Sequence, residues 1–312
     1  MKSALRIVFM GTPDFATATL QSMVQMGYKV VGVVTAPDKP AGRGQKLTQS
    51  SVKTFALKHG LELLQPKNLK DESFVEDLKS LKADLQVVVA FRKLPKVVWD
   101  MPTKGTFNLH ASLLPKYRGA APINWAIING EKESGVTTFF IDENIDTGTI
   151  ILQKSCPIKT SDNAGNLHDK LMILGSELVC ETIDLISSNN YQCRKQNGKI
   201  THAPKIYKAD CKLNWSDSIF NIHQKIKGLS PYPSSWTQIS NDKTLKIFES
   251  SVLEAKHNLA YGTIITDGKN ELKVAAKGGY VYLLDVQLSG KKRMKVDEFL
   301  RGFRFEKHTI LN

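Results

Sequence analysis

The sequence predicts an α/β protein in which a doubly wound, mainly parallel sheet is followed by a small antiparallel β-barrel. Apolar, β-branched runs at residues 5–10 and 28–34 flank an amphipathic helical pattern at 14–26. This order of strand, helix and strand begins a βαβ unit. The same alternation continues to residue 187, whereas short strand-like runs dominate the last hundred residues.

The remaining elements of the sheet follow in order along the chain. Strand-like runs lie at 61–64, 84–90, 105–110, 135–141 and 149–155, and helical patterns lie at 51–59, 71–82 and 122–129. A long amphipathic helix is expected over residues 163–187. Alternation of this kind covers both faces of a mainly parallel sheet with helices.

The pattern changes at residue 188. The next stretch, residues 188–210, is polar and basic without helical periodicity, which is typical of a linker. A helix is then predicted at 217–229, and short strands are predicted near 236–239, 244–252, 262–266, 271–275 and 280–285. Short strands at close spacing favour a barrel of the OB type. We therefore predict an α/β domain at 1–189, a linker at 190–208 and a basic barrel domain at 209–312.

Composition argues against a membrane-spanning, secreted or disulfide-stabilised protein. No apolar run in the 312 residues reaches ~18 residues, so no membrane span is expected. The short apolar run at the N-terminus lacks the length and cleavage site of a signal peptide. Four cysteines lack C-x-x-C spacing, which argues against a zinc site or a disulfide framework and favours the reducing cytoplasm. They are Cys156, Cys180, Cys193 and Cys211.

The positive charge is concentrated in the last two-fifths of the chain. The formal net charge is +13. Lys and Arg outnumber Asp and Glu by 22 to 19 over residues 1–190, but by 21 to 11 over residues 191–312. A basic domain beside a nearly neutral one indicates a polyanionic partner, most often nucleic acid. A solvated basic surface is the alternative.

Common nucleotide-binding and hydrolase motifs are missing from the α/β half. The loop after the first predicted strand reads GTPDFA (11–16), and only Gly11 matches the glycine-rich dinucleotide fingerprint, so NAD is not expected. The sequence contains neither a phosphate-binding P-loop nor a G-x-S-x-G nucleophile motif.

Polar residues at the ends of two predicted strands form a candidate site. Asn108 and His110 are two residues apart in one strand, so their side chains project on the same face. Asp146 follows a second strand in an Asp-Thr-Gly turn. Each residue alone has a structural explanation, but ligands of open α/β sheets bind beyond strand ends of this kind.

The residue types favour direct acyl transfer. An Asn side chain can donate a hydrogen bond to a developing oxyanion. A His carries protons near neutral pH, and a nearby carboxylate favours its charged form. Ser112 offers a hydrolase alternative, but a side chain two residues beyond His110 and across a turn pairs poorly with it.

The stretch NLHASLLPKYRGAAPINWAI (108–127), followed by DTG (146–148), resembles the signature of the folate-dependent formyltransferase family. GTPDFA (11–16), PDKPAGRGQKL (37–47) and HAPKI (202–206) narrow the resemblance to members that act on charged tRNA. The similarity covers nearly the whole chain. One segment differs, since AFRKLP (90–95) stands where the family usually has A-Y-G-x-I-L-P.

The resemblance implies a reaction and its participants. The members that act on charged tRNA transfer the formyl group of 10-formyltetrahydrofolate to the α-amine of methionine esterified to initiator tRNA. The resemblance implies no metal. The family's catalytic residues match Asn108, His110 and Asp146. Its folate-binding residues match Ser112, Leu113, Leu114 and Pro115.

Two basic segments are candidates for tRNA contact. The loop at 41–47 resembles the family insertion that reaches the acceptor end of the tRNA, with Arg43 and Lys46 as its contacts. The densest basic cluster, GKKRMK (290–295), offers Lys291, Lys292 and Arg293. Solvated charged turns are the alternative for both segments. We expect a monomer, because nothing in the pattern demands an interface.

Two other functions remain open from the sequence. A formyltransferase that acts on an amino sugar or a glycinamide nucleotide could share the catalytic half, although the basic C-terminal half argues against a small acceptor. A non-catalytic RNA-binding protein is the second alternative, and the complete Asn, His and Asp set argues against it.

Overall fold

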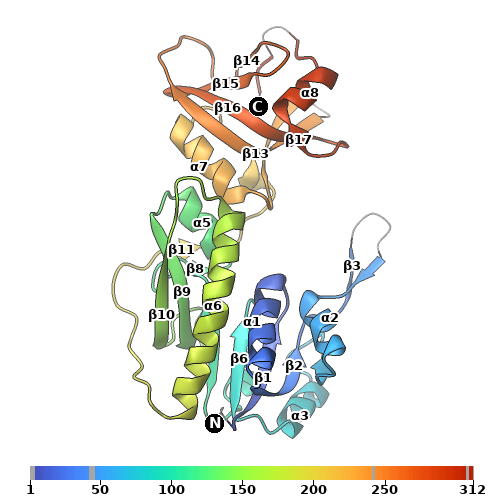
Figure 1. Cartoon of the computed structure of the whole chain (residues 1–312), viewed down its shortest axis with the longest axis vertical. Helices are drawn as coiled ribbons and strands as arrows, with labels where there is room; N and C mark the ends of the chain where they lie inside the picture. The colour runs from blue at the N-terminus through green and yellow to red at the C-terminus, as the bar shows by residue number, and fades with distance from the viewer. Residues whose placement is uncertain (1–3, 42–45, 241–242, 307–308, 312) are drawn as a thin grey trace. The chain divides into compact units, whose positions relative to one another are not determined.

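The computed structural model describes residues 4–41, 46–240, 243–306 and 309–311 (Figure 1). The chain forms two compact units. Unit 1 comprises Met1–Gly119, Glu133–Pro157 and His168–Ala203. Unit 2 comprises Ala120–Lys132, Ile158–Leu167 and Pro204–Asn312.

Unit 1 is built on a seven-stranded sheet with the strand order β10-β9-β7-β6-β1-β2-β5. The strands are β1 (Arg6–Gly11), β2 (Lys29–Val34), β5 (Leu63–Leu64), β6 (Leu85–Val89), β7 (Thr106–His110), β9 (Glu133–Phe140) and β10 (Ile150–Pro157). The five strands from β5 to β7 pair in parallel, whereas β9 and β10 pair antiparallel. The predicted mainly parallel sheet is therefore confirmed.

Helices cover both faces of this sheet (Figure 1). They are α1 (Asp14–Gln25), α2 (Ser51–Lys58), α3 (Glu72–Ser80), α4 (Lys96–Trp99) and α6 (Ala164–Ser187). On one face, Phe74 of α3 and Val98 of α4 pack with Val8 and Val88 of the sheet. On the other face, Gly175 of α6 lies against Leu109, where an added Cβ would come within 2.8 Å of the leucine side chain.

Short pairs of strands extend unit 1 beyond the main sheet. β3 (Lys39–Ala41) pairs with β4 (Lys46–Thr48), and β8 (Arg118–Gly119) pairs in parallel with β11 (His202–Ala203). The second pair joins segments that are more than 80 residues apart, and sequence periodicity gives no signal for pairs this short.

Unit 2 contains an antiparallel sheet curled into an OB-like half-barrel, in the strand order β12-β13-β16-β15-β14 with β17 on β16 (Figure 1). Its elements are α5 (Pro122–Ile128), η1 (Ala209–Cys211), α7 (Ile219–Leu229), β12 (Ser235–Ser240), β13 (Lys243–Glu254), β14 (Ile264–Thr266), β15 (Leu272–Ala276), β16 (Gly279–Leu288), β17 (Met294–Lys295) and α8 (Val296–Gly302). The five predicted short strands all form. Helix α8 was not predicted from the sequence.

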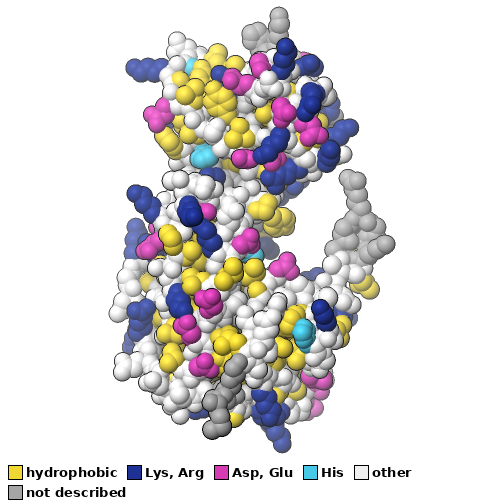
Figure 2. Space-filling view, viewed as in Figure 1, with side chains coloured by type: hydrophobic (Ala, Val, Ile, Leu, Met, Phe, Trp, Pro, Cys, Tyr) yellow, Lys and Arg dark blue, Asp and Glu magenta, His cyan; other side chains and the backbone are white. Residues whose placement is uncertain are grey.

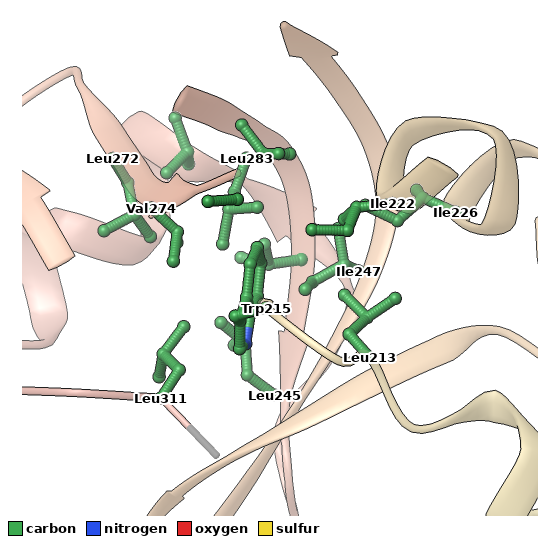
Figure 3. Packing of buried hydrophobic residues seen from close by; sticks show 14 of the residues in the cluster. Leu213, Trp215, Ile222, Ile226, Leu245, Ile247, Leu272, Val274, Leu283 and Leu311 are labelled. Atoms are coloured by element: carbon green, nitrogen blue, oxygen red, sulfur yellow. The ribbon is translucent and has the colours of Figure 1, made fainter. Parts of the chain in front are cut away.

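The concave side of this sheet closes over a buried apolar core (Figure 3). Trp215 is 4 % exposed and donates its indole N–H to the Thr237 hydroxyl at 2.9 Å, so its one polar atom is satisfied inside the core. Side chains from the strands and from α7 surround it, among them Leu245, Ile222 and Leu283. Unit 2 thus has a core of its own.

Candidate active site

Strand β7 positions the first two candidate residues. Phe107 and Leu109 are buried on one face, so Asn108 and His110 share the opposite face. Asn108 pairs with Val88 of the parallel strand β6, and His110 is the last residue of β7. The alternation places the polar pair at the carboxyl edge of the parallel strands, as the sequence predicted.

His110 is held by a backbone carbonyl group. Its Nε2 atom lies 2.8 Å from the carbonyl oxygen of Tyr117, and the imidazole is 7 % exposed. A carbonyl oxygen can only accept, so Nε2 carries a proton and donates it to this bond. In the neutral ring the other nitrogen, Nδ1, then has a free lone pair.

The Asp146 carboxylate faces Nδ1. Its Oδ2 atom is 3.8 Å from Nδ1, which is too long for a hydrogen bond but close enough for a strong charge interaction once the ring is protonated. The same oxygen accepts a hydrogen bond from the backbone N–H of Gly119 at 2.8 Å. Asp146 is therefore oriented independently of the histidine.

Asp146 does not directly follow a strand end that lies next to the end of β7. Because β9 runs antiparallel to β7, Phe140 at its carboxyl end pairs with Phe107 rather than with His110. The loop over residues 141–149 must therefore fold back along the face that bears Asn108 and His110. Spacing in the sequence did not reveal this return.

Two residues of the site adopt the left-handed backbone conformation although neither is glycine. Tyr117 has φ 60° and Asp146 has φ 57°. This conformation is uncommon for side chains other than Gly, Asn and Asp, and it concentrates at functional sites; at Tyr117 it costs about 1–3 kcal/mol. At both positions it belongs to a residue that contacts the His110 ring, which supports a functional assignment.

The Ser112–Pro115 stretch forms a tight turn after β7. Ser112 is fully buried and donates its hydroxyl to the Lys116 carbonyl at 2.6 Å. The Leu114 backbone is held by Thr137, through a 3.2 Å hydrogen bond to the threonine hydroxyl. Leu113 and Pro115 instead line a cavity of about 240 Å³, and Tyr117 forms part of the same wall. The predicted folate contacts thus divide into two that shape the turn and two that border open space.

The AFRKLP segment is fixed by Arg92. Its guanidinium donates to the carbonyl oxygen of Lys67 at 2.8 Å and also to that of Pro66. Burial lowers the pKa of Arg92 below its ordinary value. Ala90, the first residue of the segment, has φ 47°, in the left-handed region that side chains such as alanine rarely adopt.

The structure describes only some of the residues that were predicted to contact tRNA. Arg43 lies outside the described residues, and of Lys46 only the backbone, in β4, is described. Lys291 and Lys292 are exposed, and Lys292 lies 3.4 Å from Glu298. Lys and Arg side chains mix with acidic ones around β17 and α8 (Figure 2).

The Arg293 side chain is bound by other residues of unit 2. It donates two hydrogen bonds to the Asp285 carboxylate, at 2.9 and 3.0 Å, and its guanidinium lies over the Phe248 ring. The hydrogen bonds to Asp285 raise the pKa of Arg293 above its ordinary value. A planar guanidinium held in this way is less available to a phosphate than the two lysines before it.

Two kinds of feature are absent from the described ranges. No group of three or more His, Cys, Asp or Glu side chains there is arranged to hold a metal ion. Within the same residues, no helix has the length and apolar character that crossing a bilayer requires.

Two residues that shape the site were missed by sequence reasoning. Gly119 orients Asp146, and a Cβ at this position would lie 2.6 Å from the Ala203 carbonyl oxygen, so only glycine fits. Gln196 donates to the backbone carbonyls of Asp146 and Gly148. It lies in the predicted linker, where no local pattern marks a site residue.

An α/β sheet with Asn108 and His110 at a strand end, and Asp146 of a loop beside the His110 ring, is an arrangement suited to an enzyme of group transfer. Comparison with known families identifies the chain further: the formyl transferase family matches residues 5–183, and the formyl transferase C-terminal domain matches residues 205–304. The chain is 54 % identical over 320 residues to the methionyl-tRNA formyltransferase of Bacteroides thetaiotaomicron, covering 100 % of this chain and 99 % of that protein. It is also 54 % identical over 306 residues to the methionyl-tRNA formyltransferase of Flavobacterium johnsoniae, covering 96 % and 97 %. The chain therefore belongs to the formyl transferase family.

Solved structures share the fold. An N-formyltransferase from Helicobacter canadensis, in complex with folinic acid and dTDP-3-aminofucose, aligns with a TM-score of 0.67 at 24 % identity, covering 89 % of this chain and 98 % of that one. HypX from Aquifex aeolicus, in complex with tetrahydrofolic acid, aligns with a TM-score of 0.66 at 17 % identity, covering 98 % and 49 %.

Replacing Gly148 with alanine tests the geometry of the Asp146 loop. An added Cβ would lie 1.7 Å from the Phe140 carbonyl oxygen, so the loop has to move and carry Asp146 away from His110. We expect kcat/KM for formyl transfer to fall about 10²-fold, as misplacement by about 1 Å does elsewhere. Gly302→Ala, where a Cβ meets nothing within 4 Å, is the matched control. Equal activity of the two variants would contradict the proposed role of the loop.

Proposed function

We propose that this chain transfers the formyl group of 10-formyltetrahydrofolate to the free amino group of methionyl-initiator tRNA, which gives formylmethionyl-tRNA for translation initiation. The single observation that carries the chemistry is the His110 ring, with Nε2 bound to the Tyr117 carbonyl and Nδ1 facing the Asp146 carboxylate. Full-length identity of 54 % to methionyl-tRNA formyltransferases supports the acceptor.

We assign Asn108 to the oxyanion. Attack of the methionyl nitrogen on the formyl carbon forms a tetrahedral intermediate whose oxygen carries negative charge. The Asn108 side chain shares a face with His110 and supplies a neutral N–H donor that can bind this oxygen. The intermediate collapses when the bond between the formyl carbon and folate N10 breaks.

We assign the proton transfers to His110 Nδ1. The free lone pair on Nδ1 accepts the proton that the attacking amine loses, and the same atom returns it to folate N10 as that nitrogen departs. Protons and charge therefore balance without a further reactant. Asp146, at 3.8 Å, stabilises the imidazolium that exists between these two steps.

The turn after β7 is proposed to hold the folate carrier. Leu113 and Pro115 border the cavity, which gives them apolar surface to offer a ligand. Ser112 and Leu114 act through the shape of the turn, since Ser112 binds the Lys116 carbonyl and Leu114 binds Thr137.

The barrel is proposed to bind tRNA through phosphates. We assign the parts of the chain as a catalytic domain at 1–189, a linker at 190–208 and a tRNA-binding domain at 209–312. Exposed Lys291 and Lys292 are the first candidates, and Arg43 and Lys46 remain candidates for the acceptor end. Arg293, which is bound to Asp285 but stays exposed, is a further candidate for phosphate contact.

We further propose a monomer that acts in the cytoplasm. All four cysteines are free thiols rather than disulfide partners, which suits a reducing compartment. Each unit also closes over its own apolar core, so neither needs a second chain to bury it.

Incubation with 10-formyltetrahydrofolate and methionyl-initiator tRNA tests the proposed reaction. We expect formylmethionyl-tRNA to form with the wild type, and we expect Asn108→Ala to lower kcat about 10²–10³-fold because one oxyanion donor is removed. Uncharged tRNA and free methionine are the control acceptors. Formylation of free methionine in preference to the charged tRNA, or an unaltered kcat in Asn108→Ala, would overturn the proposal.

Charge reversal tests the tRNA surface. We expect Lys291→Glu/Lys292→Glu to weaken tRNA binding and to reduce the slope of log affinity against log salt by about 0.7–0.9 for each phosphate that the variant no longer neutralises. The matched control, Lys29→Glu/Lys58→Glu, reverses two exposed charges of unit 1. A salt titration that gives the same slope for both double variants excludes this surface.

A further inference from the structure

The segment from Arg194 to Ala203 lies along the site in unit 1, although its sequence has the character of a linker. Arg194 and Ile150 exchange two backbone hydrogen bonds, at 2.8 and 2.9 Å, directly after the Asp146 loop. At the other end, β11 pairs with β8. Thr201 accepts two further hydrogen bonds, from the N–H groups of Tyr117 and Arg118, at 2.8 and 3.0 Å. The segment thus contacts both chain portions that hold His110.

Gln196 joins these two portions through one side-chain amide. Its Nε2 atom donates to the carbonyl oxygens of Asp146 and Gly148, each at 2.9 Å. Its Oε1 atom accepts from Nε and a terminal nitrogen of Arg118, at 3.1 and 2.7 Å. All four bonds have good geometry, and the side chain is only partly exposed.

These bonds reach a residue in the left-handed conformation. Asp146 has φ 57°, and its Oδ2 atom is bound by the N–H of Gly119, the residue after Arg118. The loop and the Arg118–Gly119 strand therefore meet at two places, one through the Asp146 carboxylate and one through Gln196. The two bonds from Gln196 to the loop help to hold Asp146 in this conformation.

We propose that Gln196 is a positioning residue for formyl transfer, which fixes the Asp146 carboxylate opposite Nδ1 of His110 by bridging Arg118 to the Asp146–Gly148 backbone. This inference rests on the proposed function and adds a residue from outside the α/β sheet to its site. Gln196 does not contact His110 itself, so it acts through Asp146. Its removal therefore affects catalysis more than binding.

Gln196→Glu is the sharpest variant because it keeps the size and the acceptor oxygen for Arg118. It places a second oxygen against two carbonyl oxygens, so neither bond to the loop can form. Gln192→Glu, four residues earlier, makes the same chemical change at an exposed position and is the matched control. Gln196→Ala removes the amide without that repulsion, and it carries the same comparison if Gln196→Glu does not fold.

Steady-state formylation of methionyl-initiator tRNA gives the expected pattern. We expect kcat to fall about 10–100-fold in Gln196→Glu with KM for both substrates within about twofold of the wild type, whereas Gln192→Glu matches the wild type. When Asp146 is already replaced by Asn, adding the Gln196 substitution is expected to lower kcat by less than about a further twofold. The reason is that the carboxylate that Gln196 positions is already gone.

Two results would overturn the inference. One is a kcat within about twofold of the wild type in both Gln196 variants. The other is a full, independent decrease on top of Asp146→Asn, which would make Gln196 a general structural residue. Failure of the wild type itself to formylate the charged tRNA would instead overturn the proposed function, so the two failures are distinguishable.

Discussion

The site depends on the hydrogen bond between Nε2 of His110 and the carbonyl oxygen of Tyr117. Because that oxygen can only accept, the bond fixes which nitrogen carries the proton and turns Nδ1 toward Asp146. It also explains the left-handed conformation of Tyr117, which aims a backbone carbonyl into the site at a cost in strain. The β8–β11 pair, Thr201 and Gly119 all stabilise the chain around this one acceptor.

Much of the architecture could be predicted because its causes are local. The β-branched runs and helical periodicities of the first 187 residues indicated the sheet and its helices, and the short strands indicated the barrel. Alternation along one strand was enough to place Asn108 beside His110. Asp146 was a candidate from its place after a predicted strand, and the resemblance of the flanking motifs to a family then implied its catalytic role.

The rest depended on contacts between distant segments. The return of the Asp146 loop follows from the antiparallel direction of β9, and strand direction is a property of the whole sheet rather than of one run. Gln196 stands 50 residues from the carbonyl that it binds, in a polar stretch whose composition is that of a linker. Arg293 was predicted as a tRNA contact from charge alone, and its bond to Asp285, eight residues away, could not be read from that charge.

The tautomer of His110 in the neutral form tests the account most directly. Nitrogen-15 NMR of histidine-labelled protein, with the His110 signals assigned by their disappearance in His110→Gln, distinguishes a proton on Nε2 from one on Nδ1. The hydrogen bond to the Tyr117 carbonyl predicts the proton on Nε2. A proton on Nδ1 would leave Nε2 unable to donate to that carbonyl, and it would contradict both the positioning of the ring and the proton transfers assigned to it.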